Sequence, residues 1–190
     1  MKTCTVGSTW KKCDLHFHTP ISFDHHFKNQ TTQETVEKLT SNNVTLVAVT
    51  DHYFIDADYI QALRDASFDR ITFLPGVEVR TDLGDSAVHM IGIFSEETDI
   101  NKLSNEFCAF TKIYKDDLRN KQKLETTYTP HADFINFINE HGGLCSLHAG
   151  CGRSGSFETI GNKDWCQRTL KTDLLKSNIC LLDVTKEKHI

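Results

Sequence analysis

Several short apolar segments of this chain end in a histidine or an acidic residue, and segments with helical spacing separate them. The clearest is 44–50, a nearly continuous run of apolar and β-branched residues followed directly by Asp51 and His52. Such a run is typical of a strand buried on both faces of a parallel sheet. Because strands alternate with helices, we expect an α/β sheet or barrel, in which ligands bind at the carboxyl ends of the strands.

The pattern predicts the following order of elements. The expected strands are 13–18, 44–50, 71–74 leading into 77–79, 87–94, 144–148 and 179–184. The expected helices are 32–41, 56–66, 100–125 and 130–141, because apolar residues recur there at helical spacing. Thr31 and Glu34 have the spacing of a capping box before the first helix, and Asp56 can cap the second. We expect residues 1–190 to form one domain.

The stretch from Cys13 to Pro20 contains two histidines, His16 and His18. In a strand, the period of two places both on one face together with Asp14. Two imidazoles at this spacing can bind one cation, and a neighbouring carboxylate can orient a ring. The alternative is a solvated strand edge that carries two histidines by chance.

Further candidate ligands lie at or near the ends of later strands. They are His52, Glu78 and His148, and His89 lies close by, near the start of its expected strand. Each histidine alone would more often be structural, but together with His16 and His18 they favour a multinuclear metal site in which Glu78 bridges two cations. Asp51, beside His52, is a catalytic candidate because it could orient a ligand or shuttle a proton.

A glycine-rich loop follows His148 and runs from 149 to 161. Its backbone amides and the guanidinium of Arg153 could bind an anion, which makes Arg153 the candidate for a phosphate contact. The alternative is a flexible surface loop.

Composition limits the other classes of function. No apolar run approaches the roughly 18 residues of a membrane span, and 1–10 has no apolar core of a signal peptide. Seven cysteines without CxxC spacing fit buried thiols in a reducing compartment, so we expect a cytoplasmic protein. The net charge is −5, and residues 101–190 hold 13 basic and 11 acidic residues, which is weak support for nucleic-acid binding.

Five motifs taken together resemble those of the polymerase and histidinol phosphatase (PHP) family, and they occur in the same order. They are Asp14-Leu15-His16-Phe17-His18, Thr50-Asp51-His52, Gly76-Val77-Glu78, His89-Met90-Ile91-Gly92 and Gly142-Gly143-Leu144-Cys145-Ser146-Leu147-His148. The segments 7–12 and 148–150 are similar to the PHP module at the N-terminus of TrlF-type AAA-like ATPases.

The resemblance implies a distorted (β/α)7 barrel with two or three divalent ions, which are zinc, manganese or iron. It assigns His16 and His18 to a first metal, and it makes Glu78 the bridge to a second metal held by His89 and His148. His52 would bind a third metal with Asp24, and His25 competes with Asp24 for that role.

The activity implied by the resemblance is metal-dependent hydrolysis of phosphate esters, with nucleotides or nucleic acid among the substrates. Amide hydrolysis is a variant. The Asp-x-His motif that closes the family's site is missing, because Asp183 is followed by Val184 and Thr185. We therefore expect a barrel that is incomplete at the C-terminus. Two alternatives remain: a non-catalytic, metal-stabilised interaction module, or a fragment of a larger PHP-ATPase. The implied partners are a second copy of the chain or an ATPase.

Overall fold

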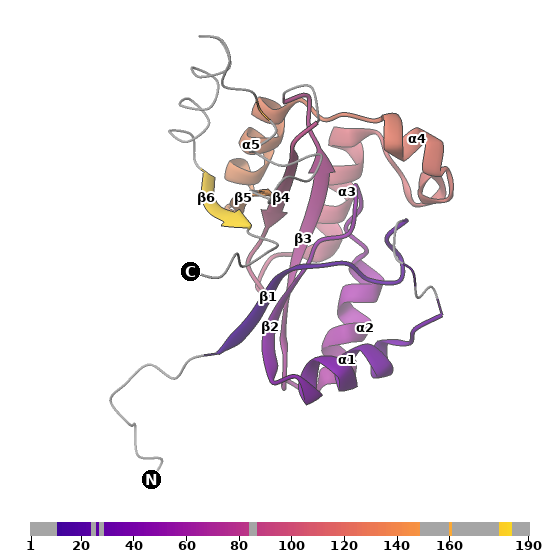
Figure 1. The fold of residues 1–190 in the computed structure, drawn as a ribbon, viewed down its shortest axis with the longest axis vertical. Coiled ribbons are helices and arrows are strands. Elements are labelled where there is room, and N and C mark those ends of the chain that lie inside the picture. The colour runs from indigo at the N-terminus through magenta and orange to yellow at the C-terminus, as the bar shows by residue number, and fades with distance from the viewer. Residues whose placement is uncertain are drawn as a thin grey trace.

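A sheet curled into a half-barrel forms the centre of the computed structural model (Figure 1). The structure describes residues 11–23, 26, 29–83, 87–148, 160 and 179–183. The strands lie side by side in chain order: β1 (Lys12–Phe17), β2 (Val44–Val49), β3 (Thr72–Arg80), β4 (His89–Ile93), β5 (Leu144–His148) and β6 (Ile179–Asp183). Within the described residues, β1 and β6 are the outer strands and do not pair with each other. The expected α/β class, with an incomplete barrel, is confirmed.

The helices begin where local capping signals place them. They are α1 (Thr32–Ser41), α2 (Ala57–Ser67), α3 (Ile100–Thr111), α4 (Lys121–Thr126) and α5 (His131–Glu140), with a 3-10 helix η1 (Lys115–Arg119) before α4. The capping box of Thr31 and Glu34 is present at the start of α1. Asp56 caps α2 by accepting a hydrogen bond from the main-chain N–H of Tyr59 at 3.0 Å.

The sheet is mainly parallel in its outer parts, but β4 runs antiparallel to both β3 and β5. Only residues 81–88 separate β3 from β4, and so short a connection can join only antiparallel neighbours. As a result, the first residue of β4, His89, pairs with the last residue of β3, Arg80. The start of β4 therefore lies at the same edge of the sheet as the carboxyl ends of the parallel strands.

β3 is one continuous strand that changes its hydrogen-bonding partner midway. Residues 72–75 pair with β2, and residues 76–80 pair with β4. At the changeover, a Cβ atom on Gly76 would lie 2.8 Å from the main-chain oxygen of Gly92 and 3.0 Å from that of Val49. Only glycine lets the three strands approach this closely, and the second half of β3 is thereby directed to the site described below.

The helix expected over 100–125 is wrong as a single element, because it is divided into α3, η1 and α4. Lys112 ends α3 in the left-handed conformation, with φ of 57°. The turn places Ile113, which is 1% exposed, in the core. Burial of this side chain therefore outweighs the continuation of the helical pattern.

The main core lies between the sheet and the helices. It joins residues of β2, β3, β4 and β5 to residues of all five α-helices, and Leu118 of η1 packs against it. A smaller cluster of Ala48, Ile91 and Ile93 forms on the opposite face of the sheet, as the alternation of strand side chains requires. Among the described residues, no helix is long and apolar enough to cross a membrane. Of the cysteines whose side chains the structure describes, Cys145 is buried, Cys108 is half-buried and Cys13 is exposed.

Candidate metal centre

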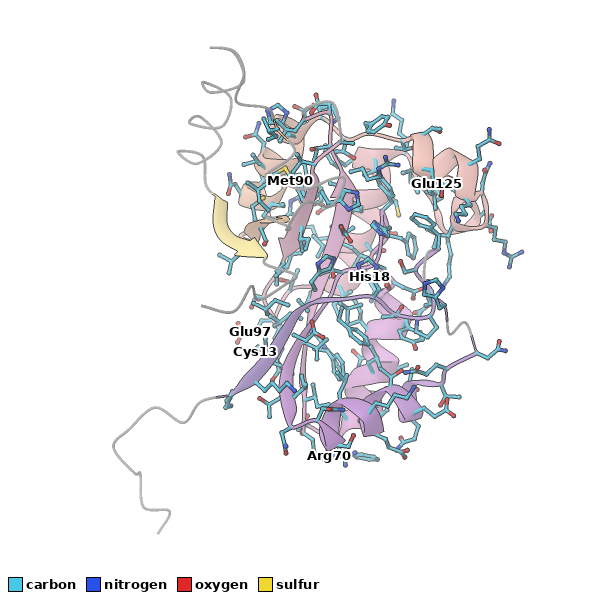
Figure 2. All side chains as sticks on the ribbon, in the orientation of Figure 1. Cys13, His18, Arg70, Met90, Glu97 and Glu125 are labelled. Carbon is cyan, nitrogen blue, oxygen red and sulfur yellow. The ribbon has the colours of Figure 1, made fainter. Side chains whose placement is uncertain are left out.

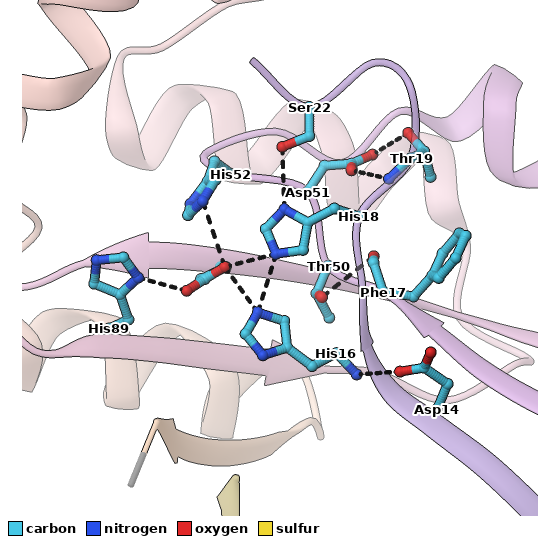
Figure 3. Close-up of polar contacts among 11 residues, drawn as sticks. Asp14, His16, Phe17, His18, Thr19, Ser22, Thr50, Asp51, His52 and His89 are labelled. Atoms are coloured by element: carbon cyan, nitrogen blue, oxygen red, sulfur yellow. Dashed lines mark hydrogen bonds and ion pairs between the residues drawn. The ribbon is translucent and has the colours of Figure 1, made fainter. Parts of the chain in front are cut away.

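The carboxylate of Glu78, in β3, is surrounded by imidazoles from three other parts of the chain (Figure 3). One carboxylate oxygen, Oε2, lies 2.9 Å from Nε2 of His16, 2.9 Å from Nε2 of His18 and 3.6 Å from Nε2 of His52. The other oxygen, Oε1, lies 2.6 Å from Nδ1 of His89. The Glu78 side chain is only 3% exposed, so these contacts take place largely away from water.

The distances among these atoms fit the donor set of a metal ion. Nε2 of His16 and Nε2 of His18 lie 3.0 Å apart, and both approach the same oxygen of Glu78. Ligand atoms about 2.0–2.2 Å from a shared ion lie roughly 3.0–3.5 Å from one another. The potential ligand atoms form two groups, one of His16, His18 and Glu78 and another of His52, Glu78 and His89, each within 4.8 Å. Glu78 is common to both groups, as a bridging carboxylate must be.

The surroundings of Glu78 keep it in its charged form. Burial by itself would raise the pKa of this carboxyl group, but the hydrogen bonds from His16, His18 and His89 and the nearby His52 lower its pKa well below the usual value. Carboxylate and imidazole are both ligands that divalent cations take in proteins, so these side chains are a suitable donor set for such an ion.

Main-chain hydrogen bonds hold the contributing segments in place. The N–H of Thr50, just after β2, donates to the oxygen of Phe17 at 2.8 Å, and this bond aligns the ends of β1 and β2. The Thr50 hydroxyl donates to the same oxygen at 3.4 Å (Figure 3). The N–H of Glu78 donates to the oxygen of Asp51 at 3.1 Å, and the N–H of Tyr53 donates back to the oxygen of Glu78 at 2.9 Å. His52 is therefore clamped beside Glu78 on both sides.

The carboxylate of Asp51 holds the loop after β1. Its two carboxylate oxygens accept hydrogen bonds from Thr19, from the N–H at 2.6 Å and from the hydroxyl at 2.7 Å. Burial raises the pKa of Asp51 to about 6, although the two bonds from Thr19 oppose this rise. These contacts anchor the residue that follows His18, so they support a positioning role for Asp51.

Two residues of this loop join the site without having been predicted. The hydroxyl of Ser22 lies 3.2 Å from Nδ1 of His18, which leaves Nε2 of that ring facing Glu78. The ring of Phe23 packs on the ring of His52, with centroids 5.0 Å apart. No motif marks either residue, since their roles depend on how the loop folds back over the strand ends. Asp14 was expected to orient a histidine ring. Its described hydrogen bond is with the backbone, because it accepts from the main-chain N–H of His16 at 3.2 Å.

The remaining predicted residues are placed only in part. Asp24, His25 and Arg153 lie outside the described residues. His148 is the last residue of β5, where its backbone pairs with that of Asp183 in β6, so it lies at the same edge of the sheet as the cluster. The assignment of His52 to a third metal with Asp24 stays a prediction, while the described geometry groups His52 with Glu78 and His89.

Comparison with known proteins supports the fold. No protein-family profile matches the sequence, and no curated protein matches it. Among solved structures, an amidohydrolase from Chromobacterium violaceum with bound sulfate and no metal is 17% identical, with a TM-score of 0.56 over 90% of this chain and 76% of that chain. A protein named as a metal-dependent phosphoesterase from Bifidobacterium adolescentis is 16% identical, with a TM-score of 0.57 over 91% of this chain and 77% of that one.

The third similar structure is the lesion-specific Endonuclease Q from Pyrococcus furiosus. It is 16% identical, with a TM-score of 0.57, and the match covers 90% of this chain but only 41% of the endonuclease. At such low identities the likeness is one of fold. The half-barrel, with its His/Glu cluster at the strand ends, is consistent with a PHP-type domain.

Proposed function

We propose that this protein is a metal-dependent hydrolase of phosphate esters. The observation that carries the proposal is the convergence of four imidazoles on the one buried carboxylate of Glu78. An ion pair between protonated histidines and Glu78 is the metal-free alternative. Hydrogen bonds alone do not account for this geometry. Oε2 of Glu78 and the Nε2 atoms of His16 and His18 lie within 3.0 Å of one another, and each Nε2 carries at most one proton, so at least one of the three contacts lacks a proton.

In this proposal the ligands divide between two adjacent sites. His16 and His18 hold one ion, His52 and His89 hold a second, and Glu78 bridges the two. Divalent ions, when bound, act as Lewis acids toward a phosphoryl group and make water nucleophilic near neutral pH. Zinc, manganese and iron are the candidate ions, because imidazole and carboxylate ligands suit all three. Asp24 and His148 are proposed to complete the metal site, as the family resemblance implies. Arg153, in the glycine-rich loop, is proposed to contact the phosphate.

The residues around the ligands prepare this site. Ser22 orients the ring of His18, and Asp51 holds Thr19 and thus the loop that carries His18. Phe23 and the core residue Tyr53 flank His52 and limit its access to water. These groups give the ligand atoms a fixed arrangement before an ion arrives, which is the usual task of residues behind a metal site.

The proposal is tested by measuring metal content and hydrolysis together. The purified protein, reconstituted with manganese or zinc, is expected to retain metal after gel filtration and to hydrolyse bis(p-nitrophenyl) phosphate. The variant His16→Ala/His18→Ala should lose both properties while keeping its circular dichroism spectrum, because these side chains are 20–21% exposed and lie outside the core. His131→Ala/His141→Ala removes two histidines that pair elsewhere, with Asp82 and Glu106, and should change neither property.

The same experiment separates the alternatives. Metal that raises thermal stability without any turnover would favour an interaction module. Hydrolysis of an anilide substrate in preference to the phosphodiester would favour the amide chemistry that the name of the Chromobacterium structure suggests. Protein that retains no metal above background in any of these conditions would contradict the proposal. A cytoplasmic location, self-association and an ATPase partner remain predictions.

A further inference from the structure

A second feature lies directly beside the His/Glu cluster. A groove of about 520 Å³ runs between the loop after β1 and the segment formed by η1 and the start of α4. Its volume falls within the roughly 300–1,000 Å³ that is common for ligand sites. Phe23 forms one wall of the groove and also packs on the ring of His52, so the groove and the cluster share this side chain.

The two sides of the groove differ in chemistry. The loop side is apolar and consists of Pro20, Ile21 and Phe23, with Leu118 facing them from η1. The other side carries three cationic side chains, those of Lys115, Arg119 and Lys121. A ligand that fills the groove therefore needs flat or apolar groups along one side and negative charge along the other.

The three cations are not equally free to bind a ligand. Lys115 is paired with the buried carboxylate of Asp56 at 2.8 Å, which fixes η1 against the start of α2. Lys121 is exposed and has a weak pair with Glu125 at 3.5 Å, which is easily exchanged for a ligand. In the part of the chain that the structure describes, Arg119 forms no ion pair and is exposed. Asp116 also lines the groove, so Arg119 and Lys121 supply its net positive charge.

This positive charge is a local feature of an acidic protein. The whole chain carries a net charge of −5, yet the segment 112–123 contains five basic and two acidic residues. Because exposed charge of one sign raises the local concentration of ligands of the opposite sign, the segment would attract a polyanion to this end of the molecule.

We propose that the groove binds single-stranded nucleic acid, with Arg119 and Lys121 on backbone phosphates and the apolar wall against a base or sugar. The inference rests on the proposed phosphoesterase function and adds a substrate class to it. Alternating negative and flat apolar groups are what a nucleic-acid strand offers, and cationic grooves with aromatic or apolar walls are how proteins bind such strands. The strand would then extend past Phe23 to the His/Glu cluster.

The test measures binding of a fluorescein-labelled oligothymidylate of about 12 nucleotides by anisotropy in EDTA, where no hydrolysis occurs. The variant Arg119→Gln/Lys121→Gln should bind more weakly by about fivefold per lost phosphate contact near 0.1 M salt. The slope of log affinity against log salt should fall by about 0.7 for each contact.

Arg70→Gln/Lys102→Gln is the matched control. Arg70 is an exposed arginine at the opposite end of the molecule from α4 (Figure 2), and Lys102 has the same spacing to Glu106 as Lys121 has to Glu125. The control removes the same two charges and should bind within twofold of the original protein. Equal weakening in both variants, no binding by the original protein, or equal competition by polyglutamate would each overturn the inference.

Hydrolysis of bis(p-nitrophenyl) phosphate keeps the two proposals apart, because this small ester does not need the groove. The Arg119→Gln/Lys121→Gln variant should keep this activity while losing oligonucleotide affinity. If the original protein binds the oligonucleotide through the groove but hydrolyses no ester with any metal, the proposed function fails and the groove assignment stands. If the original protein hydrolyses the ester but the Arg119→Gln/Lys121→Gln variant binds the oligonucleotide as tightly as the original protein does, the groove assignment fails and the proposed function stands.

Discussion

The phenol oxygen of Tyr53 donates a hydrogen bond to the main-chain oxygen of Thr127 at 2.6 Å. The same oxygen accepts a hydrogen bond from the main-chain N–H of Arg80 at 3.2 Å. Tyr53 is completely buried and has φ of 60°, a left-handed conformation that is unfavourable for a bulky side chain. Packing and these two bonds therefore stabilise a turn of unfavourable backbone conformation directly after His52. This turn places the His52 ring beside Glu78.

Removing the phenol oxygen tests this anchoring. Tyr53→Phe leaves the Thr127 oxygen and the Arg80 N–H without their partner, so the free energy of unfolding should fall by about 1–3 kcal/mol. Urea denaturation followed by circular dichroism measures the change. Tyr114→Phe is the control, because Tyr114 is 56% exposed, and its effect should stay below about 0.5 kcal/mol. Equal stability of the two variants would show that the hydrogen bonds of Tyr53 contribute little.

The changeover point in β3 gives a second prediction. Gly76→Ala places a methyl group 2.8 Å from the main-chain oxygen of Gly92, and a backbone atom in a sheet cannot move aside cheaply. The expected loss of stability is about 1–3 kcal/mol, as for other overpacked positions. Gly142→Ala is the comparison, because at Gly142 there is open space and only the φ of +66° opposes a side chain. Its expected cost is about 1 kcal/mol. If thermal denaturation shows a smaller loss of stability for Gly76→Ala than for Gly142→Ala, this account of the close packing at Gly76 is wrong.

Metal should stabilise the folded protein through Glu78. An ion at 100 times its dissociation constant raises the free energy of unfolding by about 2.7 kcal/mol, if it binds only the folded chain. Glu78→Gln removes the shared carboxylate, so manganese or zinc should no longer raise the melting temperature of this variant. Glu106→Gln is the matched change, since Glu106 also pairs with a histidine, His141 at 2.9 Å, away from the site. A melting temperature that rises with metal in Glu78→Gln as it does in Glu106→Gln would exclude Glu78 as a ligand.

The hydroxyl of Ser22 provides a test of the residues behind the ligands. Ser22→Ala removes the group that lies 3.2 Å from Nδ1 of His18, so the ring is less firmly oriented. Affinity for zinc or manganese, measured by isothermal titration calorimetry, should fall by about 10-fold or more, as is usual for such residues. Ser104→Ala removes a half-buried hydrogen bond from the Ser104 hydroxyl to the main-chain oxygen of Ile55, in another part of the fold. This change should leave metal affinity unchanged. An unaltered affinity in Ser22→Ala would mean that His18 is oriented by other contacts.

Much of the fold follows from local sequence. The capping box of Thr31 and Glu34, the cap at Asp56 and the buried run of β2 were predicted because each depends on residues close together in the chain. The convergence of His16 and Glu78 was predicted for a different reason. The two residues are far apart in the chain, but both lie at strand ends, and parallel strands bring their carboxyl ends to one edge.

Other features depend on contacts between distant segments, and only the tertiary structure decides them. The antiparallel pairing of β4 with the distant strand β5, as well as with β3, fixes β4 in the sheet and brings His89 to Glu78. The break in the helix at Lys112 follows from the burial of Ile113, which competes with helix propensity. The bonds from Thr19 to Asp51 span 32 residues, and no periodicity in the sequence encodes such a pairing. Local hydrogen bonding and side-chain alternation thus set the elements, while burial and long-range pairing set which side chains meet.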